Sequence, residues 1–231
     1  FSGSHFVLNE HNFVSWQNSL RGLELLFNPF NYLLGIALVF LSRILGAAYF
    51  MNNIKDENIK AKAVRKLSIN SILFLPFFLG FLAWIFIKEG FGVDEKGIVS
   101  MTENVYLYNF LDNILFAILF IVGVVFVLLG MVQGSKGCSK TIFTLGFGSV
   151  LAVFALFLSI GLGSSAFYPS LSDLQSSLTI RNASSSYYTL SVMAYVSLLV
   201  PFVLAYIIYV WNAMDRVKIT REEMKDSEHL Y

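Results

Sequence analysis

Five apolar stretches of about 20 residues constrain this chain more than any other feature of its sequence. Each is long enough to cross the ~30 Å hydrocarbon core of a bilayer as an α-helix, because such a helix rises ~1.5 Å per residue. The stretches are Tyr32–Met51, Ile69–Ile87, Phe110–Val132, Ile142–Leu162 and Leu190–Trp211. None shows the alternation of apolar and polar residues that membrane strands require. The pattern therefore predicts an all-α, polytopic integral membrane protein with five transmembrane helices.

The composition agrees with a membrane protein and excludes several other classes. Of 231 residues, 56% are apolar and 13% are charged, whereas soluble domains are roughly a quarter charged. The formal net charge is +1, so the chain lacks the basic excess that nucleic-acid binding needs. One cysteine, Cys138, cannot form an internal disulfide, a Cys-rich zinc site or a cysteine-ligated iron–sulfur cluster within this chain.

We expect a single transmembrane domain over residues 1–231. Residues 1–30 would form an outer-face loop and a short amphipathic helix on the membrane surface, since Leu20, Leu23 and Leu26 recur at helical spacing. Residues 212–231 would form a cytoplasmic tail. The chain starts without Met and without a signal peptide, which favours a fragment of a longer protein.

The basic residues predict the orientation. Eleven lie on one side, in the segment Asn52–Ser68, in the connection between the third and fourth spans and in the tail. Four lie on the other side, and Arg43 falls inside a span. The positive-inside rule places the basic side and the C-terminus in the cytoplasm and Phe1 outside.

Arg43 interrupts the first apolar stretch near its middle, roughly 13 Å from the inner end at ~1.5 Å per residue. A lipid-facing Arg at a helix centre costs ~2.5–3.5 kcal/mol on insertion scales. We therefore expect Arg43 to face protein. Two interpretations stay open: structural pairing with a carboxylate of a neighbouring helix or subunit, which we favour, and a role in quinone contact or proton transfer.

Other polar or reactive residues carry weaker signals. Asp112 opens the third predicted span, where a carboxylate in the first helical turn is stabilised by the macrodipole, and this favours a structural role over a proton relay. Pro76 and Pro201 fall inside spans and are expected to kink them. The three histidines all lie outside the spans, so an intramembrane haem ligated by His is not expected in this chain. Of the residues considered, only Arg43 and Asp112 are candidate functional positions.

One family is recognisable in the C-terminal half. The loop Ser177–Met193 (SLTIRNASSSYYTLSVM), the span that follows it and the tail KITREEMKDSEHLY resemble the end of subunit II of cytochrome bd quinol oxidases. Phe27–Phe50 (FNPFNYLLGIALVFLSRILGAAYF) is similar to the entry into that family's fourth span. The resemblance covers essentially the whole chain, as spans four to eight of an eight-span subunit.

This resemblance implies that the last four helices form a helix bundle and that the chain packs against a haem-bearing subunit I. Haem b, haem d and the quinol-oxidising loop would belong to subunit I, so this chain would bind no cofactor by itself and supply no catalytic residue. It would support assembly, with quinone or membrane-lipid contacts and a small accessory subunit as further partners. The complex would oxidise quinol, reduce oxygen and contribute to the proton gradient in the bacterial cytoplasmic (inner) membrane.

Two competing hypotheses come from other classes. A fragment of a secondary transporter would use Arg43 and the Pro-interrupted spans as a substrate site. Such a protein is expected to contain inverted repeats, which the sequence does not show, and it leaves the loop Ser177–Met193 unexplained. A purely structural membrane scaffold differs from the oxidase subunit only in its partner.

Overall fold

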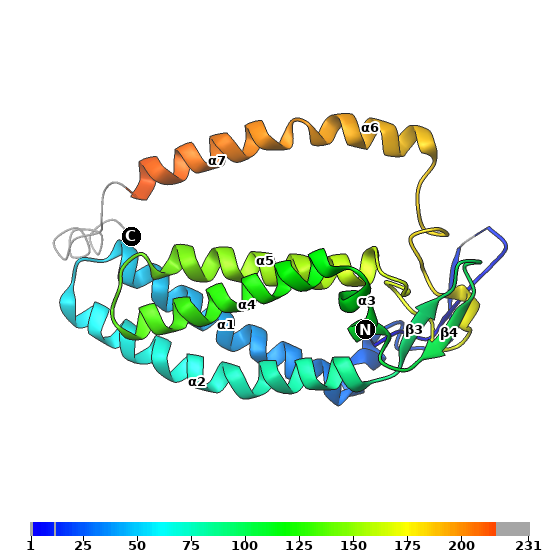
Figure 1. The fold of residues 1–231 in the computed structure, drawn as a ribbon, viewed down its shortest axis with the longest axis horizontal. Helices are drawn as coiled ribbons and strands as arrows, with labels where there is room; N and C mark the ends of the chain where they lie inside the picture. The colour runs from blue at the N-terminus through cyan, green and yellow to red at the C-terminus, as the bar shows by residue number, and fades with distance from the viewer. Residues whose placement is uncertain (1, 12, 216–231) are drawn as a thin grey trace.

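The computed structural model describes residues 2–11 and 13–215 (Figure 1). His229, Phe1 and most of the predicted tail lie outside this part of the chain. The elements are β1 (Phe6–Leu8), β2 (Val14–Trp16), the 3-10 helix η1 (Leu23–Phe27), α1 (Pro29–Asn53), α2 (Glu57–Ile87), β3 (Gly90–Val93), β4 (Val99–Thr102), α3 (Val105–Asp112), α4 (Ile114–Ser135), α5 (Thr141–Gly161), the 3-10 helix η2 (Leu174–Ser176), α6 (Tyr187–Ser197) and α7 (Val200–Asp215).

Five helical segments are long and apolar enough to cross a membrane, namely α1, α2, α4, α5 and the α6–α7 pair. The five predicted spans are therefore confirmed. In the described residues, strands occur only as two antiparallel pairs, β1 with β2 and β3 with β4. The prediction of an all-α, polytopic membrane protein is confirmed as well.

Helix α2 begins 12 residues before the predicted span, so the basic segment that was expected to be a loop is helical. The Asp56 side chain caps this helix, because its Oδ1 accepts hydrogen bonds from the backbone N–H groups of Asn58 (2.8 Å) and Ile59 (3.1 Å). Residues 57–68 contain neither Gly nor Pro and are rich in Ala and Lys, which favour helix. Pro76 lies within α2, which continues through it.

The third and fifth spans are each divided. Asn113, at φ −112° and ψ 84°, separates the short helix α3 from α4, so the third span begins at Ile114 and not at Phe110. Residues 198 and 199 separate α6 from α7. Pro201 lies in the first turn of α7, where the missing N–H costs nothing, and it cannot continue the preceding helix.

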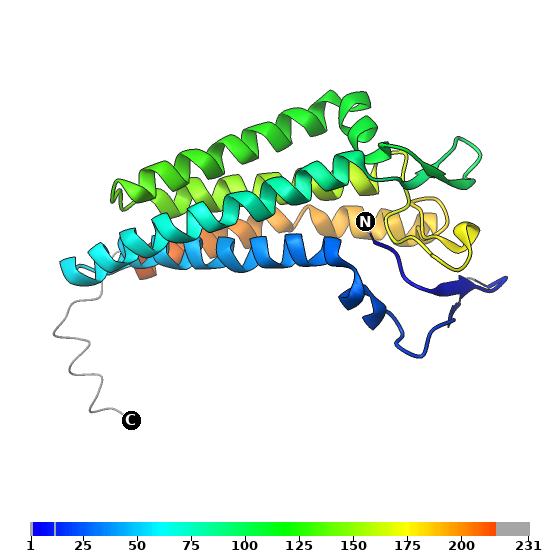
Figure 2. The same cartoon turned by 90° about the horizontal axis from the view of Figure 1, so that it is seen from below.

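Helices α1, α2, α4 and α5 pack into one bundle of two hairpins (Figures 1 and 2). Three residues join α1 to α2 and five join α4 to α5, and such short connections force antiparallel neighbours. The largest buried cluster takes residues from all four helices, including Ile44 of α1, Leu67 of α2, Met131 of α4 and Leu145 of α5. This cluster holds the two hairpins together.

The backbones of α4 and α5 approach closely at two glycines. A Cβ atom added at Gly123 would lie 2.5 Å from the Ala152 backbone nitrogen, and one added at Gly148 would lie 2.7 Å from the Val127 nitrogen. Small residues permit this approach, which is the usual way that helices gain contact in a membrane.

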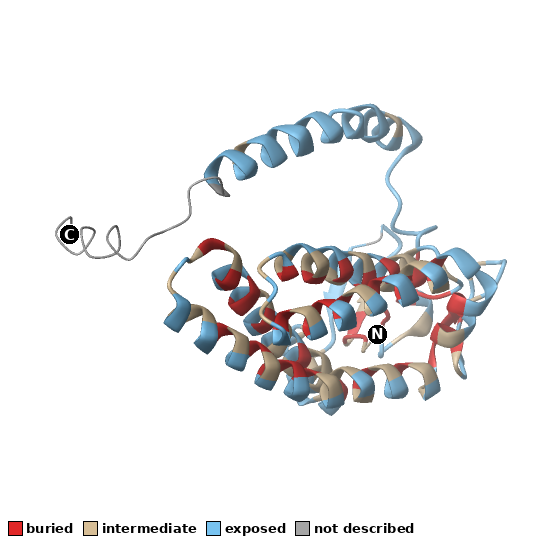
Figure 3. Ribbon diagram, turned by 60° about the vertical axis from the view of Figure 1, so that its left-hand side comes forward, coloured by how far each residue is buried: buried red, intermediate tan, exposed pale blue. Residues whose placement is uncertain are grey.

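The prediction that the last four helices form the bundle is wrong, because the fifth span does not join it. Helix α6 buries no residue, and none of the residues in the apolar 18-residue stretch of the α6–α7 segment is buried (Figure 3). The connection from α5 to α6 spans residues 162–186, too long to force the two together as neighbours. The bundle is thus formed by the first four spans.

The bundle has two unlike ends. At one, the basic end, lie the α1–α2 and α4–α5 turns; the Ser68 hydroxyl donates to Ser135 Oγ (3.1 Å) there. The basic end carries Lys55, Lys60, Lys62, Arg65, Lys66, Lys136 and Lys140. At the other, the capped end, both strand pairs and η2 cover the helices (Figure 1). The Gln175 side chain ties η2 to β4, because it exchanges two hydrogen bonds with the Val99 backbone.

Where a short amphipathic helix was expected before the first span, the structure has a short 3-10 helix. Only the single 3-10 turn Leu23–Phe27 forms, and its Leu23, Leu26 and Phe27 side chains are exposed. Gly22 before it has φ 98°, in the left-handed region that ends a right-handed helix. After it, the Asn28 side chain accepts a hydrogen bond from the Phe30 N–H (3.0 Å) and starts α1 with Pro29 in the first turn.

Candidate functional site

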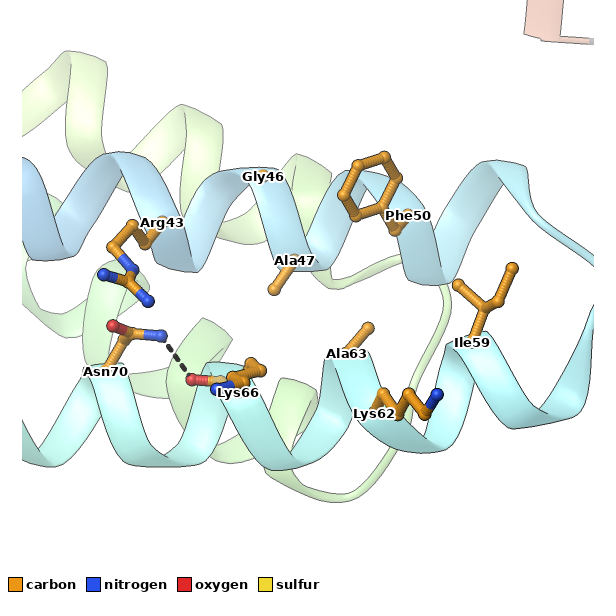
Figure 4. A pocket seen from close by; sticks show the side chains of 9 residues that line it. All are labelled: Arg43, Gly46, Ala47, Phe50, Ile59, Lys62, Ala63, Lys66 and Asn70. Carbon is orange, nitrogen blue, oxygen red and sulfur yellow. Dashed lines mark hydrogen bonds between the residues drawn. The ribbon is translucent and has the colours of Figure 1, made fainter.

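The candidate site is a groove of about 460 Å³ between α1 and α2 (Figure 4). Its lining comes from one face of each helix and combines cationic, amide and apolar side chains. From α1 come Arg43, Gly46, Ala47 and Phe50, and from α2 come Ile59, Lys62, Ala63, Lys66 and Asn70. No carboxylate lines this groove in the described part of the chain.

The helical repeat explains why these residues share a groove. Positions three, four and seven apart lie on one face of an α-helix. Arg43, Gly46 and Phe50 follow this spacing on α1, and Lys62, Lys66 and Asn70 are separated by four residues each on α2. Leu67, one position after Lys66, lies on a different side of α2 and is fully buried in the bundle core. The amphipathic first third of α2 thus turns its cations to one side of the hairpin.

Arg43 extends from α1 toward α2, and its guanidinium is directed at the side-chain amide of Asn70 (Figure 4). Asn70 is buried, and its amide nitrogen donates to the Lys66 backbone oxygen at 2.6 Å. Arg43 itself is exposed, and it forms no hydrogen bond or ion pair with any residue that the structure describes. The carboxylate partner that we favoured for it does not occur in that part of the chain.

Arg43 lies nearer to the basic end of α4 than to the middle of that helix. Asn70 lies three residues, or about 5 Å along the helix, from Leu67. A Cβ added to Gly134 would meet the Leu67 side chain, so Leu67 is level with the end of α4. The α1–α2 hairpin projects past the α4–α5 hairpin at the basic end (Figure 2). Arg43 therefore lies about one helical turn from the end of α4, because the four helices do not end at one level.

Asp112 lies at the opposite, capped end and does not meet Arg43. It is the last residue of α3 and exposed, and not a residue in the first turn of the third span. The break at Asn113 explains the difference, because the span starts only after it. The macrodipole argument made for Asp112 as part of the spanning helix therefore does not apply as stated.

Two further polar features at the capped end were not predicted from the sequence. Asn109 is buried, and its amide nitrogen donates to the Ser159 backbone oxygen (2.9 Å) and to Ser165 Oγ (3.0 Å). Its Oδ1 accepts from the Ser164 N–H at 3.0 Å. Asn109 thus fastens α3 to the end of α5. A lone Asn in an apolar run gives no signal of such long-range partners.

The second feature is a pair of groups with shifted pKa values. Burial raises the pKa of the Tyr106 phenol to about 12, and its hydroxyl lies against the backbone of Phe91. Burial also lowers the pKa of Lys88, whose ammonium stands 4.7 Å from the centre of the Phe30 ring. Both groups lie just outside the spans, in the cap of the bundle.

Residues 1–214 match the family described as cytochrome bd terminal oxidase subunit II. The chain belongs to this family. A comparison with individual curated proteins finds no match. Cytochrome bd subunit II is part of an oxidoreductase complex, so the chain is a subunit of a bd-type terminal oxidase.

Membership of the cytochrome bd subunit II family raises the question of haem. The described histidines, His5 and His11, both belong to the N-terminal segment, and His5 Nδ1 lies 3.2 Å from Ser172 Oγ. No group of three or more His, Cys, Asp or Glu side chains that could hold a metal ion occurs within residues 2–11 and 13–215. Neither histidine lies in a membrane-spanning helix, and we assign no haem chemistry to them.

Proposed function

We propose that this chain is the non-haem subunit of an oxidase that transfers electrons from quinol to oxygen in the aerobic respiratory chain. In this proposal it supports the assembly of a haem-bearing subunit I and so contributes to the proton gradient only through that complex. The observation that carries the proposal is the family match over residues 1–214. No observation favours the secondary transporter, and the family match supports the oxidase instead.

The unburied fifth span supports a role in assembly. Helices α6 and α7 present large apolar side chains on all sides, among them Tyr195, Phe202 and Tyr209, each more than 70% exposed. In a membrane such side chains contact either lipid or another protein, and helix contacts there depend on packing more than on hydrophobicity. A span without packing partners in its own chain is a suitable surface for subunit I.

The test is to produce the full-length protein with and without subunit I and to record reduced-minus-oxidised spectra. We expect haem b and haem d signals and quinol-dependent oxygen uptake only when subunit I is present. Omitting this chain should lower the yield of haem-loaded complex. A stoichiometric haem in this chain alone would contradict the non-haem assignment, and full haem loading of subunit I without this chain would contradict the assembly role.

We also propose that the basic end faces the cytoplasm. The basic end carries seven cations, three in the α1–α2 and α4–α5 turns and four at the start of α2, whereas the capped end holds few. Reporter fusions at Lys62 and Cys138 should then report the cytoplasm, and fusions at Lys96 and Asp173 the outside. A fusion at Lys225, which lies outside the described residues, should also report the cytoplasm. An external signal at Lys62 would reverse the orientation.

A further inference from the structure

We propose that the groove between α1 and α2 binds the phosphate-bearing headgroup of an anionic phospholipid. Arg43, Lys62 and Lys66 would bind the headgroup, and the apolar lining would contact the start of its acyl chains. This inference is independent of haem chemistry and of the role in assembly, because it rests on the α1–α2 hairpin alone.

Charge is the first argument. Three cationic residues line one groove from two helices, and no carboxylate lines it. The Arg43 guanidinium is directed into the groove, and among the described residues it has no ion pair that would neutralise its charge. A phosphate oxygen is the ordinary partner for such a group, since Arg and Lys bind phosphate through charge-assisted hydrogen bonds. The groove is therefore complementary to an anion.

Depth is the second argument, and it indicates a lipid. Arg43 lies about one turn inside the end of α4, whereas Lys62 precedes Leu67 by five residues, or about 7 Å along α2, and so lies beyond that end. Helix α2 has 31 residues, about 46 Å at the usual rise, and so exceeds a ~30 Å hydrocarbon core by several turns. The cations thus occupy the zone where headgroups meet acyl chains. Basic pockets between spans at this level are typical of anionic-lipid sites.

Shape is the third argument. The groove is open along the side of the hairpin, and its floor is made of small residues: a Cβ added at Gly46 would meet no atom within 4 Å, and Ala47 and Ala63 are buried beside it. Phe50 and Ile59 form its outer part (Figure 4). A fully hydrated ion gains nothing from such apolar walls, whereas a glycerol backbone and acyl chain do.

The experiment uses the full-length protein in its native complex, purified in detergent and stripped of lipid. Dioleoylphosphatidylglycerol is titrated, and binding is measured as thermal stabilisation and as lipid retained in native mass spectrometry. Each cation in contact with the anionic headgroup should contribute roughly a fivefold change in affinity, so the triple variant Arg43→Gln, Lys62→Gln, Lys66→Gln should bind about a hundredfold more weakly. The matched triple variant Lys55→Gln, Lys60→Gln, Arg65→Gln removes the same charge from residues outside the groove and should lose less than about fivefold.

A second pair of variants leaves every charge in place. Gly46→Leu fills the groove and should abolish retention of phosphatidylglycerol. Gly35→Leu adds the same side chain to the same helix three turns away, where a Cβ also meets no atom within 4 Å, and should leave retention unchanged. If the triple charge variant does not assemble, this pair of variants still tests whether the lipid binds in the groove.

Other outcomes overturn the proposal. Equal loss in the two charge variants would indicate a diffuse surface effect without a site. Equal binding of dioleoylphosphatidylcholine would remove the requirement for an anionic lipid. Competition by inorganic phosphate at the same concentration as the lipid would identify the ligand as a free anion. Unchanged retention in Gly46→Leu would exclude the groove itself.

Discussion

The four-helix bundle and the α6–α7 segment are both apolar enough to cross a membrane, yet only the bundle is packed. In the apolar 18-residue stretch of each bundle span, between a fifth and a third of the residues are buried. In the corresponding stretch of the α6–α7 segment, no residue is buried. Hydropathy therefore predicts that a helix enters the membrane, but not that it packs against other helices. In the bundle, small residues such as Gly123 allow backbones to meet, and short turns hold the hairpins in register. The α6–α7 segment has neither a short connection to α5 nor a contact with the core.

The largest effect is expected from truncating a buried aromatic side chain of the bundle. Phe81 of α2 is fully buried, with its ring centre 5.2 Å from that of Phe30. Phe81→Ala should lower the free energy of unfolding by about 3–5 kcal/mol, through lost contacts and the cavity left behind. The control Phe202→Ala, on α7, should cost less than about 0.5 kcal/mol in the chain alone. Denaturant unfolding of both variants measures this.

Equal destabilisation of the two Phe variants in the chain alone would contradict the difference in packing between the bundle and the α6–α7 segment. Both variants should also be measured in the complete complex. A cost at Phe202 that appears only when subunit I is present would identify α7 as part of the subunit interface.

A second test uses pH and the buried phenol of Tyr106, whose pKa of about 12 lies above the ordinary value of 10. Between these values the folded protein keeps the proton that the unfolded chain has lost, so stability falls as pH rises above about 10. The loss should reach about 2–3 kcal/mol by pH 12, and it should be absent in Tyr106→Phe.

Tyr209→Phe, on the exposed α7, is the control for this pH series and should leave the wild-type curve unchanged. Unfolding midpoints recorded from pH 8 to pH 12 make the comparison. A Tyr106→Phe curve parallel to that of the wild type would show that this phenol does not titrate as its burial requires.

A third test concerns the close approach of α4 and α5. Gly123→Ala adds a methyl group 2.5 Å from a backbone nitrogen, and overpacking of this kind should cost about 1–3 kcal/mol. Gly146→Ala adds the same group on α5, where it meets no atom within 4 Å, and should be neutral or slightly stabilising. Thermal unfolding of the two variants separates packing from helix propensity, and equal midpoints would refute the close contact.

The smallest effect is expected in α7. Pro201→Ala restores one N–H donor in a first helical turn, where its absence has little cost. Stability should change by less than about 0.5 kcal/mol, while amide exchange at residues 198–202 should slow as α6 and α7 join. Unchanged exchange would show that the break has another cause than Pro201.

Only part of the candidate site could be predicted from the sequence. Arg43 was recognisable because a charge in an apolar run is costly. Its surroundings were not, since Lys62 and Lys66 were counted only as loop cations that set orientation. Their helical spacing, four residues apart, was present in the sequence, but the face they share with Asn70 has meaning only once α2 is known to begin at Glu57. The depth of Arg43 depends on how far the α1–α2 hairpin projects past the α4–α5 hairpin, which no local pattern encodes.

Local hydropathy and short motifs were enough to predict the number of spans, their approximate bounds and the family, because each of these is encoded within one stretch of chain. Which four spans form the bundle, where Asp112 lies and which residues share the groove depend on contacts between distant parts of the chain. A lipid-facing helix and a helix-facing helix can be equally apolar, so burial in a membrane protein is set by close contacts such as that of Gly123 with Ala152, and these join residues far apart in the sequence.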